Sequence, residues 1–117
     1  MIALTANTKI FLAAGPTDMR KGFDGLFGLV TDVLKQDPLA GHLFLFVNRR
    51  QDKLKVLYWD GDGLAIWYRR LEQGTFQLPK FDADAVAASM NADDLVMLLR
   101  GIDYSRVRRR KRFSLAG

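Results

Sequence analysis

The sequence predicts an α+β fold in which a mostly antiparallel sheet packs against one long helix. Three apolar segments of strand length follow one another as a meander over 43–71, separated by turn sequences. An apolar stripe with helical spacing precedes them and predicts the long helix over about 18–36. A second, short helix is expected over about 91–101. The 117 residues suit a single domain, placed at 1–105, with a basic C-terminal tail at 106–117.

The first elements are a strand and the long helix. Residues 9–14 form a short apolar run that ends in a Gly-Pro turn and predicts a strand. Thr17 or Asp18 can cap the helix that follows. Its apolar positions are Met19, Phe23, Leu26, Val30 and Leu34. The helix is expected to stop before Pro38, because the residue before a proline disfavours helical backbone.

The meander carries the strongest local signals. Residues 43–47 are all apolar, which is typical of a strand buried on both faces. Strands at 53–59 and 64–71 flank Asp-Gly-Asp-Gly, a hairpin turn sequence. If the turn has an even number of residues, one face of this hairpin is apolar and suits the core, while the other face mixes basic, aromatic and apolar side chains. The core face then holds Leu54, Val56, Tyr58, Ala65 and Trp67, and the mixed face holds Lys53, Lys55, Tyr68 and Arg70 at one end, with Leu57, Trp59, Leu64 and Ile66 nearer the turn. A turn of odd length would place different residues together on each face.

The C-terminal third predicts shorter elements. Residues 75–78 suit a short strand, and residues 84–89 suit an edge strand. Asn91 can cap the second helix, where two aspartates in the first turn favour the helix dipole. Gly101 suits its C-terminal end.

Composition excludes several classes of protein. The chain has no cysteine and one histidine, so disulfides, thiolate metal sites, cysteine nucleophiles and multi-histidine metal sites are excluded. No apolar run reaches the length of a membrane span, and the N-terminus does not resemble a signal peptide. We therefore expect a cytoplasmic protein without membrane contact.

The positive charge is concentrated in one segment. The net charge is +5, and residues 106–112 hold six cations. The other positions carry 12 cations against 13 acids, so the body of the chain is nearly neutral. A clustered block of this kind favours a polyanion such as nucleic acid as the partner.

Motifs for catalysis are missing from the sequence. Asp-Gly-Asp-Gly opens like a calcium-binding loop, but Ala65 stands where that loop needs glycine and Leu71 where it needs glutamate. There is no phosphate-binding loop and no Gly-x-Ser-x-Gly motif. Asp18, Asp24, Asp60 and Asp62 could together hold a divalent metal, yet their spacing does not indicate it. We expect a protein that is not an enzyme and uses no cofactor and no metal.

Nucleic-acid binding is the preferred interpretation of the cations. The tail supplies most of the expected phosphate contacts, the basic region of the meander extends them, and Arg20 and Lys21 add a weaker contribution near the start of the long helix. The candidate residues are Arg106, Arg108, Arg109, Arg110, Lys111, Arg112, Arg49, Arg50, Lys53, Lys55, Arg20 and Lys21. The alternative is a protein adaptor that docks a partner through the apolar face of the meander.

Many spaced positions together resemble a known family. They are Thr17-Asp18-Met19-Arg20-Lys21-Gly22, Asp24-Gly25-Leu26, Asp37-Pro38, Gly41, Leu43-Phe44, Asn48-Arg49-Arg50, Lys55, Leu57-Tyr58-Trp59-Asp60-Gly61, Gly63, Trp67-Tyr68, Arg70-Leu71-Glu72, Gly74, Phe76, Pro79 and Leu98-Leu99-Arg100-Gly101-Ile102-Asp103. Over roughly residues 8–112 the chain resembles the small accessory protein, labelled TnpB, that the second open reading frame of IS66-family insertion elements encodes. The same label is used for much longer, unrelated RNA-guided nucleases, which this chain does not resemble.

The resemblance implies a role in bacterial DNA transposition. In such elements a larger, separate protein resembles an acidic-triad transposase, so the expected partners are DNA and that transposase. The family carries no agreed catalytic residues, so the resemblance assigns no active site to this chain. This agrees with the residues themselves, which form no constellation able to do chemistry.

Overall fold

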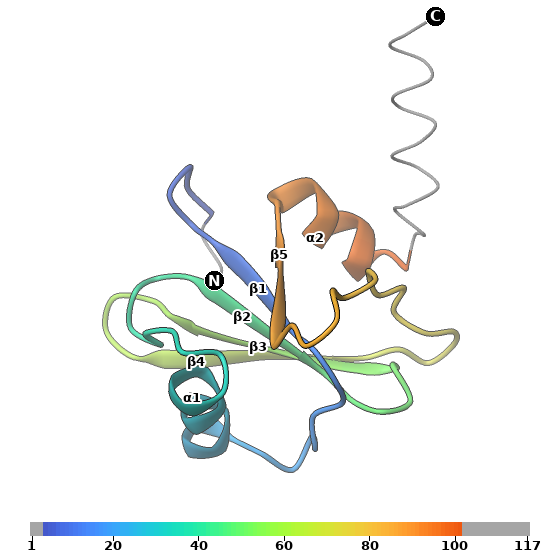
Figure 1. Ribbon diagram of the computed structural model, residues 1–117, viewed down its shortest axis with the longest axis horizontal. Coiled ribbons are helices and arrows are strands. Elements are labelled where there is room, and N and C mark those ends of the chain that lie inside the picture. The colour runs from blue at the N-terminus through green and yellow to red at the C-terminus, as the bar shows by residue number, and fades with distance from the viewer. Residues whose placement is uncertain (1–3, 102–117) are drawn as a thin grey trace, which may run out of the picture.

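Five strands form one sheet in the computed structural model, which describes residues 4–101. The strands are β1 (Ile10–Ala13), β2 (Leu43–Val47), β3 (Lys53–Trp59), β4 (Leu64–Arg70) and β5 (Ala87–Met90). Their order across the sheet is β4-β3-β2-β1-β5. Helix α1 (Phe23–Asp32) connects β1 to β2, and helix α2 (Ala92–Leu99) follows β5 (Figure 1). The predicted basic tail lies outside the described residues.

The predicted fold class is wrong in its sheet, which is mixed. β1 pairs parallel to β2, with Ile10 opposite Leu43, and antiparallel to β5, with Ile10 opposite Met90. The chain leaves β1, passes through α1 and re-enters the sheet in the same direction, which is how a helical crossover makes neighbouring strands parallel. The meander of β2, β3 and β4 is therefore one part of a larger sheet.

The predicted long helix is also wrong, because α1 has only 10 residues. Gly22 is its N-cap residue and makes no side-chain cap, so neither Thr17 nor Asp18 caps it. Asp18 instead accepts the main-chain N–H of Arg20 at 2.9 Å, which forms a turn before the helix. At the other end Lys35 adopts φ 56°, a left-handed conformation that ends the helix well before Pro38.

Lys55 explains the late start of α1. Its Nζ donates hydrogen bonds of 2.7 Å to the carbonyl oxygens of Met19 and Lys21. In a helix that began at Asp18, these oxygens would accept main-chain N–H groups four residues further along. The buried ammonium of β3 takes the place of those helical donors, so residues 19–21 remain an irregular segment.

The predicted register of the hairpin is confirmed. Lys53 lies opposite Arg70 and Lys55 opposite Tyr68, while Trp59 lies opposite Leu64 beside the four-residue turn. The prediction that β2 is buried on both faces is also confirmed, since all five of its residues are buried.

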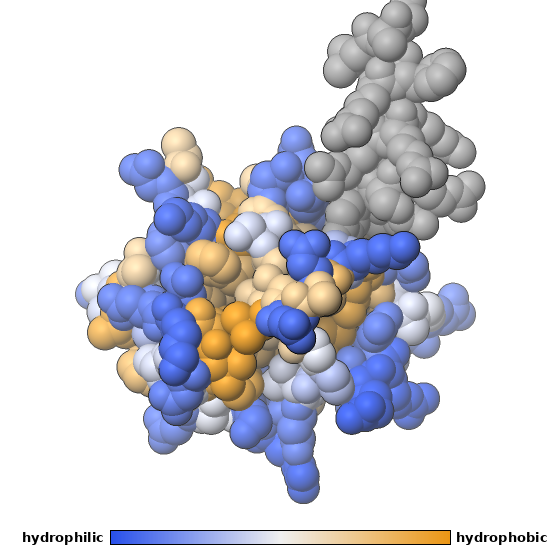
Figure 2. Space-filling view, viewed as in Figure 1, coloured by the Kyte–Doolittle hydropathy of each residue, from blue (hydrophilic) through white to orange (hydrophobic). Residues whose placement is uncertain are grey.

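Both faces of the sheet are covered. On one face α1 packs on β2 and β3, and the buried cluster there comprises Leu26, Val30, Leu34, Phe44, Phe46 and Leu57. On the other face α2 and the segment before β5 close a second cluster, which comprises Ile10, Leu12, Leu43, Leu45, Val47, Leu54, Val56, Tyr58, Phe76, Met90, Leu95 and Leu98. Figure 2 shows one side of the molecule, where hydrophobic residues in the centre are bordered by hydrophilic ones.

The C-terminal elements differ in part from expectation. Residues 75–78 are irregular and are not the predicted strand. The predicted edge strand exists as β5, at the border of the sheet. Asn91 caps α2 as predicted: its side chain accepts the N–H of Asp94 at 2.7 Å, while the Asp94 side chain accepts the N–H of Asn91. Within residues 4–101, neither helix has the length and apolarity needed to cross a bilayer.

Candidate nucleic-acid interface

The turn between β2 and β3 presents two neighbouring arginines. Asn48 organises this turn: its Oδ1 accepts the N–H of Asp52 at 3.0 Å and that of Lys53 at 2.9 Å. Its Nδ2 donates to the Asp52 carboxylate at 2.7 Å. Gln51 takes a positive φ of 61°, which closes the turn. Arg49 and Arg50 therefore project from a turn held by a dense set of local hydrogen bonds. We call residues 48–53 the basic turn.

Neighbouring segments hold the basic turn in place. The N–H of Thr17, between β1 and α1, donates to the carbonyl of Val47 at 2.8 Å. From the segment after β4, Phe76 donates its N–H to Gln51 at 2.7 Å, and Leu71 donates to Asp52 at 2.7 Å. Three parts of the chain thus meet at this end of the sheet, and the turn is supported along its whole length.

The cations of the basic turn are not neutralised by ion pairs. Within residues 4–101 the ion pairs are Arg20 with Asp18 and Arg70 with Glu72, so Arg49, Arg50 and Lys53 take part in none. Arg49 and Arg50 are exposed. Asp52, the acid within the turn, has its pKa lowered mainly by the hydrogen bond from Asn48, with Arg50 and Lys53 adding to the effect. The turn thus carries three cations and one ionised carboxylate.

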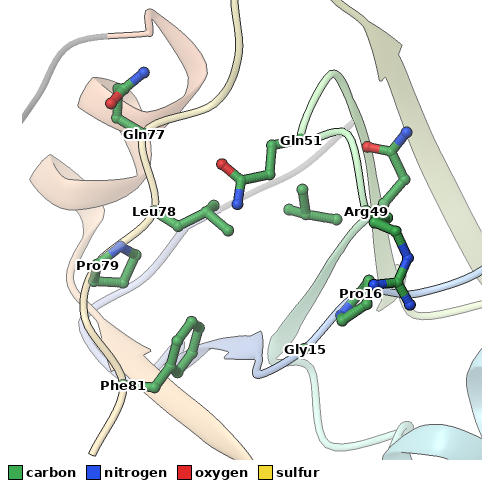
Figure 3. Close-up of a pocket in the computed structure, with 10 residues that line it drawn as sticks. Gly15, Pro16, Arg49, Gln51, Gln77, Leu78, Pro79 and Phe81 are labelled. Carbon is green, nitrogen blue, oxygen red and sulfur yellow. The ribbon is translucent and has the colours of Figure 1, made fainter.

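Two depressions flank Arg49. The first has a volume of about 490 Å³ and lies between the basic turn and residues 77–81. In Figure 3, Arg49 and Gln51 lie across this depression from Gln77 and Phe81. The second has a volume of about 450 Å³ and lies between the turn and residues 16–19. Arg49 lines both depressions, as do Pro16 and Asn48.

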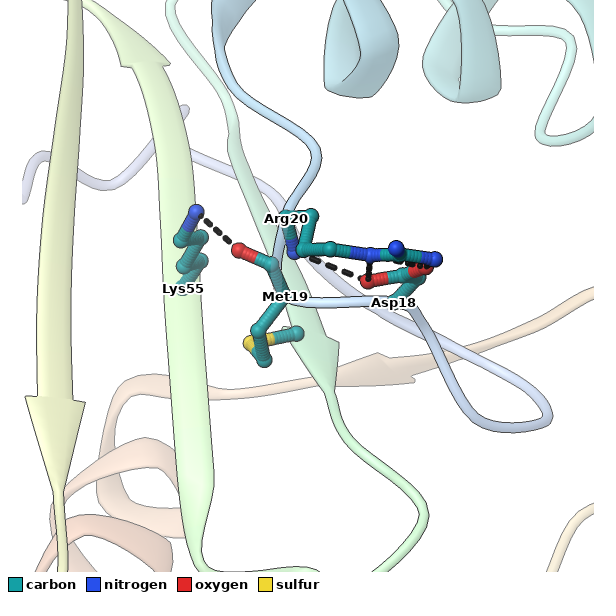
Figure 4. A network of polar contacts seen from close by, with 4 residues as sticks. All are labelled: Asp18, Met19, Arg20 and Lys55. Carbon is teal, nitrogen blue, oxygen red and sulfur yellow. Dashed lines mark hydrogen bonds and ion pairs between the residues drawn. The ribbon is translucent and has the colours of Figure 1, made fainter.

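Not every predicted phosphate-binding residue is free to bind. Lys55 is only 8% exposed, and its ammonium is held by the carbonyl oxygens of Met19 and Lys21. Figure 4 shows the bond to Met19. Arg20 forms a two-pronged pair with Asp18, with its Nη2 2.7 Å from Oδ2, and this pair lowers the pKa of Asp18 to about 2. Lys21 is exposed and lies before α1, not in its first turn. The six tail cations, Arg106, Arg108, Arg109, Arg110, Lys111 and Arg112, lie outside the described residues.

The aspartates considered for a metal do not gather in one place. Within residues 4–101 no three potential ligands come together to hold an ion. Asp60 instead accepts the N–H groups of Asp62 and Gly63 and shapes the turn between β3 and β4. Asp18 lies beside the basic turn, which follows β2 at the other end of the sheet.

The apolar face considered for partner docking is partly covered by α1. Leu57 is fully buried against α1, and Leu64 and Ile66 pack against the same cluster. Trp59, Leu64 and Ile66 are half-buried. Tyr68 is 51% exposed. This side of the meander is therefore core beneath α1 and reaches solvent along β4.

The sequence reasoning overlooked how the basic turn is organised. The sequence alone did not single out Asn48 and Asp52, although asparagine and aspartate in a hairpin loop favour side-chain hydrogen bonds to the turn. The depression beside residues 77–81 has no local signal, because it arises where segments distant in sequence meet.

Replacing Asn48 with alanine should raise the pKa of Asp52. The Asn48 hydrogen bond is the main cause of the lowered pKa, so its loss should bring the value back toward 3.8. Carboxyl chemical shifts followed by NMR through an acid titration measure this change. The pKa of Asp60, in the other turn, should stay unchanged in the same spectra, and an unmoved Asp52 would contradict the assigned role of Asn48.

Comparison with known proteins identifies the family of this chain. Residues 8–109 match the family model described as IS66 Orf2-like protein, TnpB. The chain is similar to two proteins of Sinorhizobium fredii. "Uncharacterized protein y4jC" is 36% identical over 110 residues, which cover 94% of this chain and 92% of that protein. "Uncharacterized protein y4hO" is 40% identical over 104 residues, which cover 89% of each chain. No solved structure matches the chain. The chain therefore belongs to the IS66 Orf2-like family, the TnpB accessory proteins of transposition by IS66 insertion elements.

Proposed function

We propose that this protein is a non-catalytic accessory factor of transposition that binds DNA through backbone phosphates. The observation that carries the proposal is the basic turn, where Arg49 and Arg50 are exposed, unpaired among residues 4–101, and held by a rigid network. Arginine binds phosphate oxygens through a planar fork of donors, and a fixed turn lowers the entropy lost on binding. The family membership makes DNA the polyanion to test first.

The proposed interface combines the basic turn with the tail. Lys53 lines the second depression together with Arg50 and extends the positive surface there. Lys21 is exposed, two residues after Met19, which lines the same depression. Lys55 is left out, because its ammonium is held by main-chain oxygens. Contacts of this kind give affinity and orientation but do not read base sequence. The element's transposase is the proposed protein partner.

Neutralising Arg49 and Arg50 together with glutamine should weaken DNA binding and make it less sensitive to salt. Each lost phosphate contact lowers the slope of log affinity against log salt by about 0.9, so the pair should lower it by about 1.8. Replacing the six tail cations with glutamine should lower it by about 5 if all six contact phosphate. Fluorescence anisotropy of a labelled DNA duplex over a salt series measures both slopes.

A matched control keeps the same change in net charge. Lys9 and Lys35 lie at the other end of the sheet, before β1 and before β2, and replacing both with glutamine should leave the slope unchanged. If this control lowers the salt slope as much as the Arg49 and Arg50 replacement does, DNA affinity depends on net charge alone. The basic turn is then not the binding site. If the wild-type chain does not bind DNA at low salt, the proposal fails and docking to the transposase is the function to test.

A further inference from the structure

Tyr68 is an exposed aromatic residue within a basic surface. It belongs to β4, the edge strand that pairs with β3 alone, and 51% of its surface is exposed. Arg70 follows two residues later on the same face, about 7 Å along the strand. Lys53 lies directly opposite Arg70, in the basic turn. An aromatic ring therefore stands within one side-chain length of two cations.

Lys55 fixes one face of this ring. Its Nζ lies 4.8 Å from the ring centroid of Tyr68, in a cation–π contact. The same ammonium is held by the carbonyls of Met19 and Lys21, so it cannot swing away without breaking two hydrogen bonds. The ring is thus oriented by the ammonium of Lys55, and about half of the residue's surface remains open to solvent at the edge of the sheet.

We propose that Tyr68 stacks on an unpaired DNA base while Lys53 holds an adjacent phosphate. Arg70 pairs with Glu72 at 2.8 Å and is not counted among the phosphate contacts. The inference rests on the DNA binding proposed above and adds that the bound DNA is single-stranded at this point. An aromatic ring can stack on a base of any identity only where that base is not already stacked between neighbours in a duplex. A preoriented ring beside cations is the arrangement that single-strand-binding surfaces use.

The charges around Tyr68 favour nucleic acid over an added protein strand. The exposed part of β4 ends in Tyr68, Arg69 and Arg70, and arginines on an edge strand oppose pairing with another strand. Arg69 also donates to the carbonyl of Leu99 at 3.0 Å, which ties the end of β4 to α2. The exposed apolar area there is a single ring, which suits one base better than the side chains of a partner strand.

The test compares single-stranded and duplex DNA with the full chain. The probes are a labelled oligothymidine of about 20 nucleotides and a duplex of the same length. Tyr68→Ala should weaken binding to the single strand by roughly 5- to 150-fold, the range that corresponds to loss of one stacked base. Its affinity for the duplex should change by less than about twofold, because duplex contacts are made to phosphates. Tyr68→Phe should keep single-strand affinity, since the ring is retained.

Leu39→Ala is the matched control for removal of an exposed apolar side chain. Leu39 is 47% exposed and precedes β2, at the end of the sheet away from the basic turn. Its replacement should therefore leave the affinity for both DNA probes unchanged. Circular dichroism of each variant checks that the fold is retained.

Any one of five results would overturn the inference. Equal weakening of both probes by Tyr68→Ala would show a structural or phosphate role, and no change with either probe would show that Tyr68 is not in contact. Wild-type binding to duplex but not to single strand would remove the inference and leave the proposed function standing, whereas binding to neither removes both. Sedimentation without DNA gives one more outcome. If the wild-type chain is a dimer and Tyr68→Ala makes it a monomer, the edge strand β4 binds a second copy of the chain instead of DNA.

Discussion

Replacing Phe76 with alanine should lower the free energy of unfolding by about 3–5 kcal/mol, the usual effect of removing a fully buried phenylalanine. Phe76 is 0% exposed, although it lies in an irregular segment and not in a strand or helix. Its ring fills the cluster between the sheet and α2, and its N–H bonds to Gln51. Urea unfolding followed by tryptophan fluorescence measures the change.

Phe23 provides the control for this replacement. It begins α1 with 50% of its surface exposed, so Phe23→Ala should cost less than about 1 kcal/mol. If Phe76→Ala lowers the free energy of unfolding by no more than Phe23→Ala does, the role given to Phe76 is contradicted. The result bears on the interface as well, because residues 77–81, which follow Phe76, form one wall of the first depression.

Replacing Lys55 with methionine should lower the free energy of unfolding by about 2–4 kcal/mol, since hydrogen bonds from a charged donor are worth more than neutral ones. Methionine keeps the apolar stem and removes the three donors. The carbonyl oxygens of Met19 and Lys21 then lose their partner in a half-buried segment, and Tyr68 loses the cation beneath its ring. Chemical denaturation measures the change in the free energy of unfolding, and hydrogen exchange shows which segment of the chain is destabilised.

Lys53→Met is the matched control, two residues earlier on the same face of β3. Lys53 has no ion pair within residues 4–101 and is only partly buried, so its loss should change stability by less than about 0.5 kcal/mol. In Lys55→Met, amide exchange should speed up in residues 19–25, where the irregular segment leads into α1. Unchanged exchange there would mean that Lys55 does not hold this segment.

Several features of the protein follow from the sequence by itself. The apolar run at 43–47 and the alternation around Asp-Gly-Asp-Gly correctly placed β2, β3, β4 and their register, because strand burial and turn chemistry depend on near neighbours. Asn91 was identified as a helix cap for the same reason. The concentration of charge at 106–112 and the family resemblance also needed no structure.

The tertiary structure alone decided which strands are parallel, where α1 begins and which cations remain free. The apolar stripe from Met19 to Leu34 predicted a helix throughout, yet the carbonyls of Met19 and Lys21 bond to a lysine more than thirty residues away. The same two bonds remove Lys55 from the phosphate-binding set and orient Tyr68 above it. Such contacts depend on which distant segments of the chain meet in the fold, so the pattern of neighbouring residues in the sequence cannot predict them.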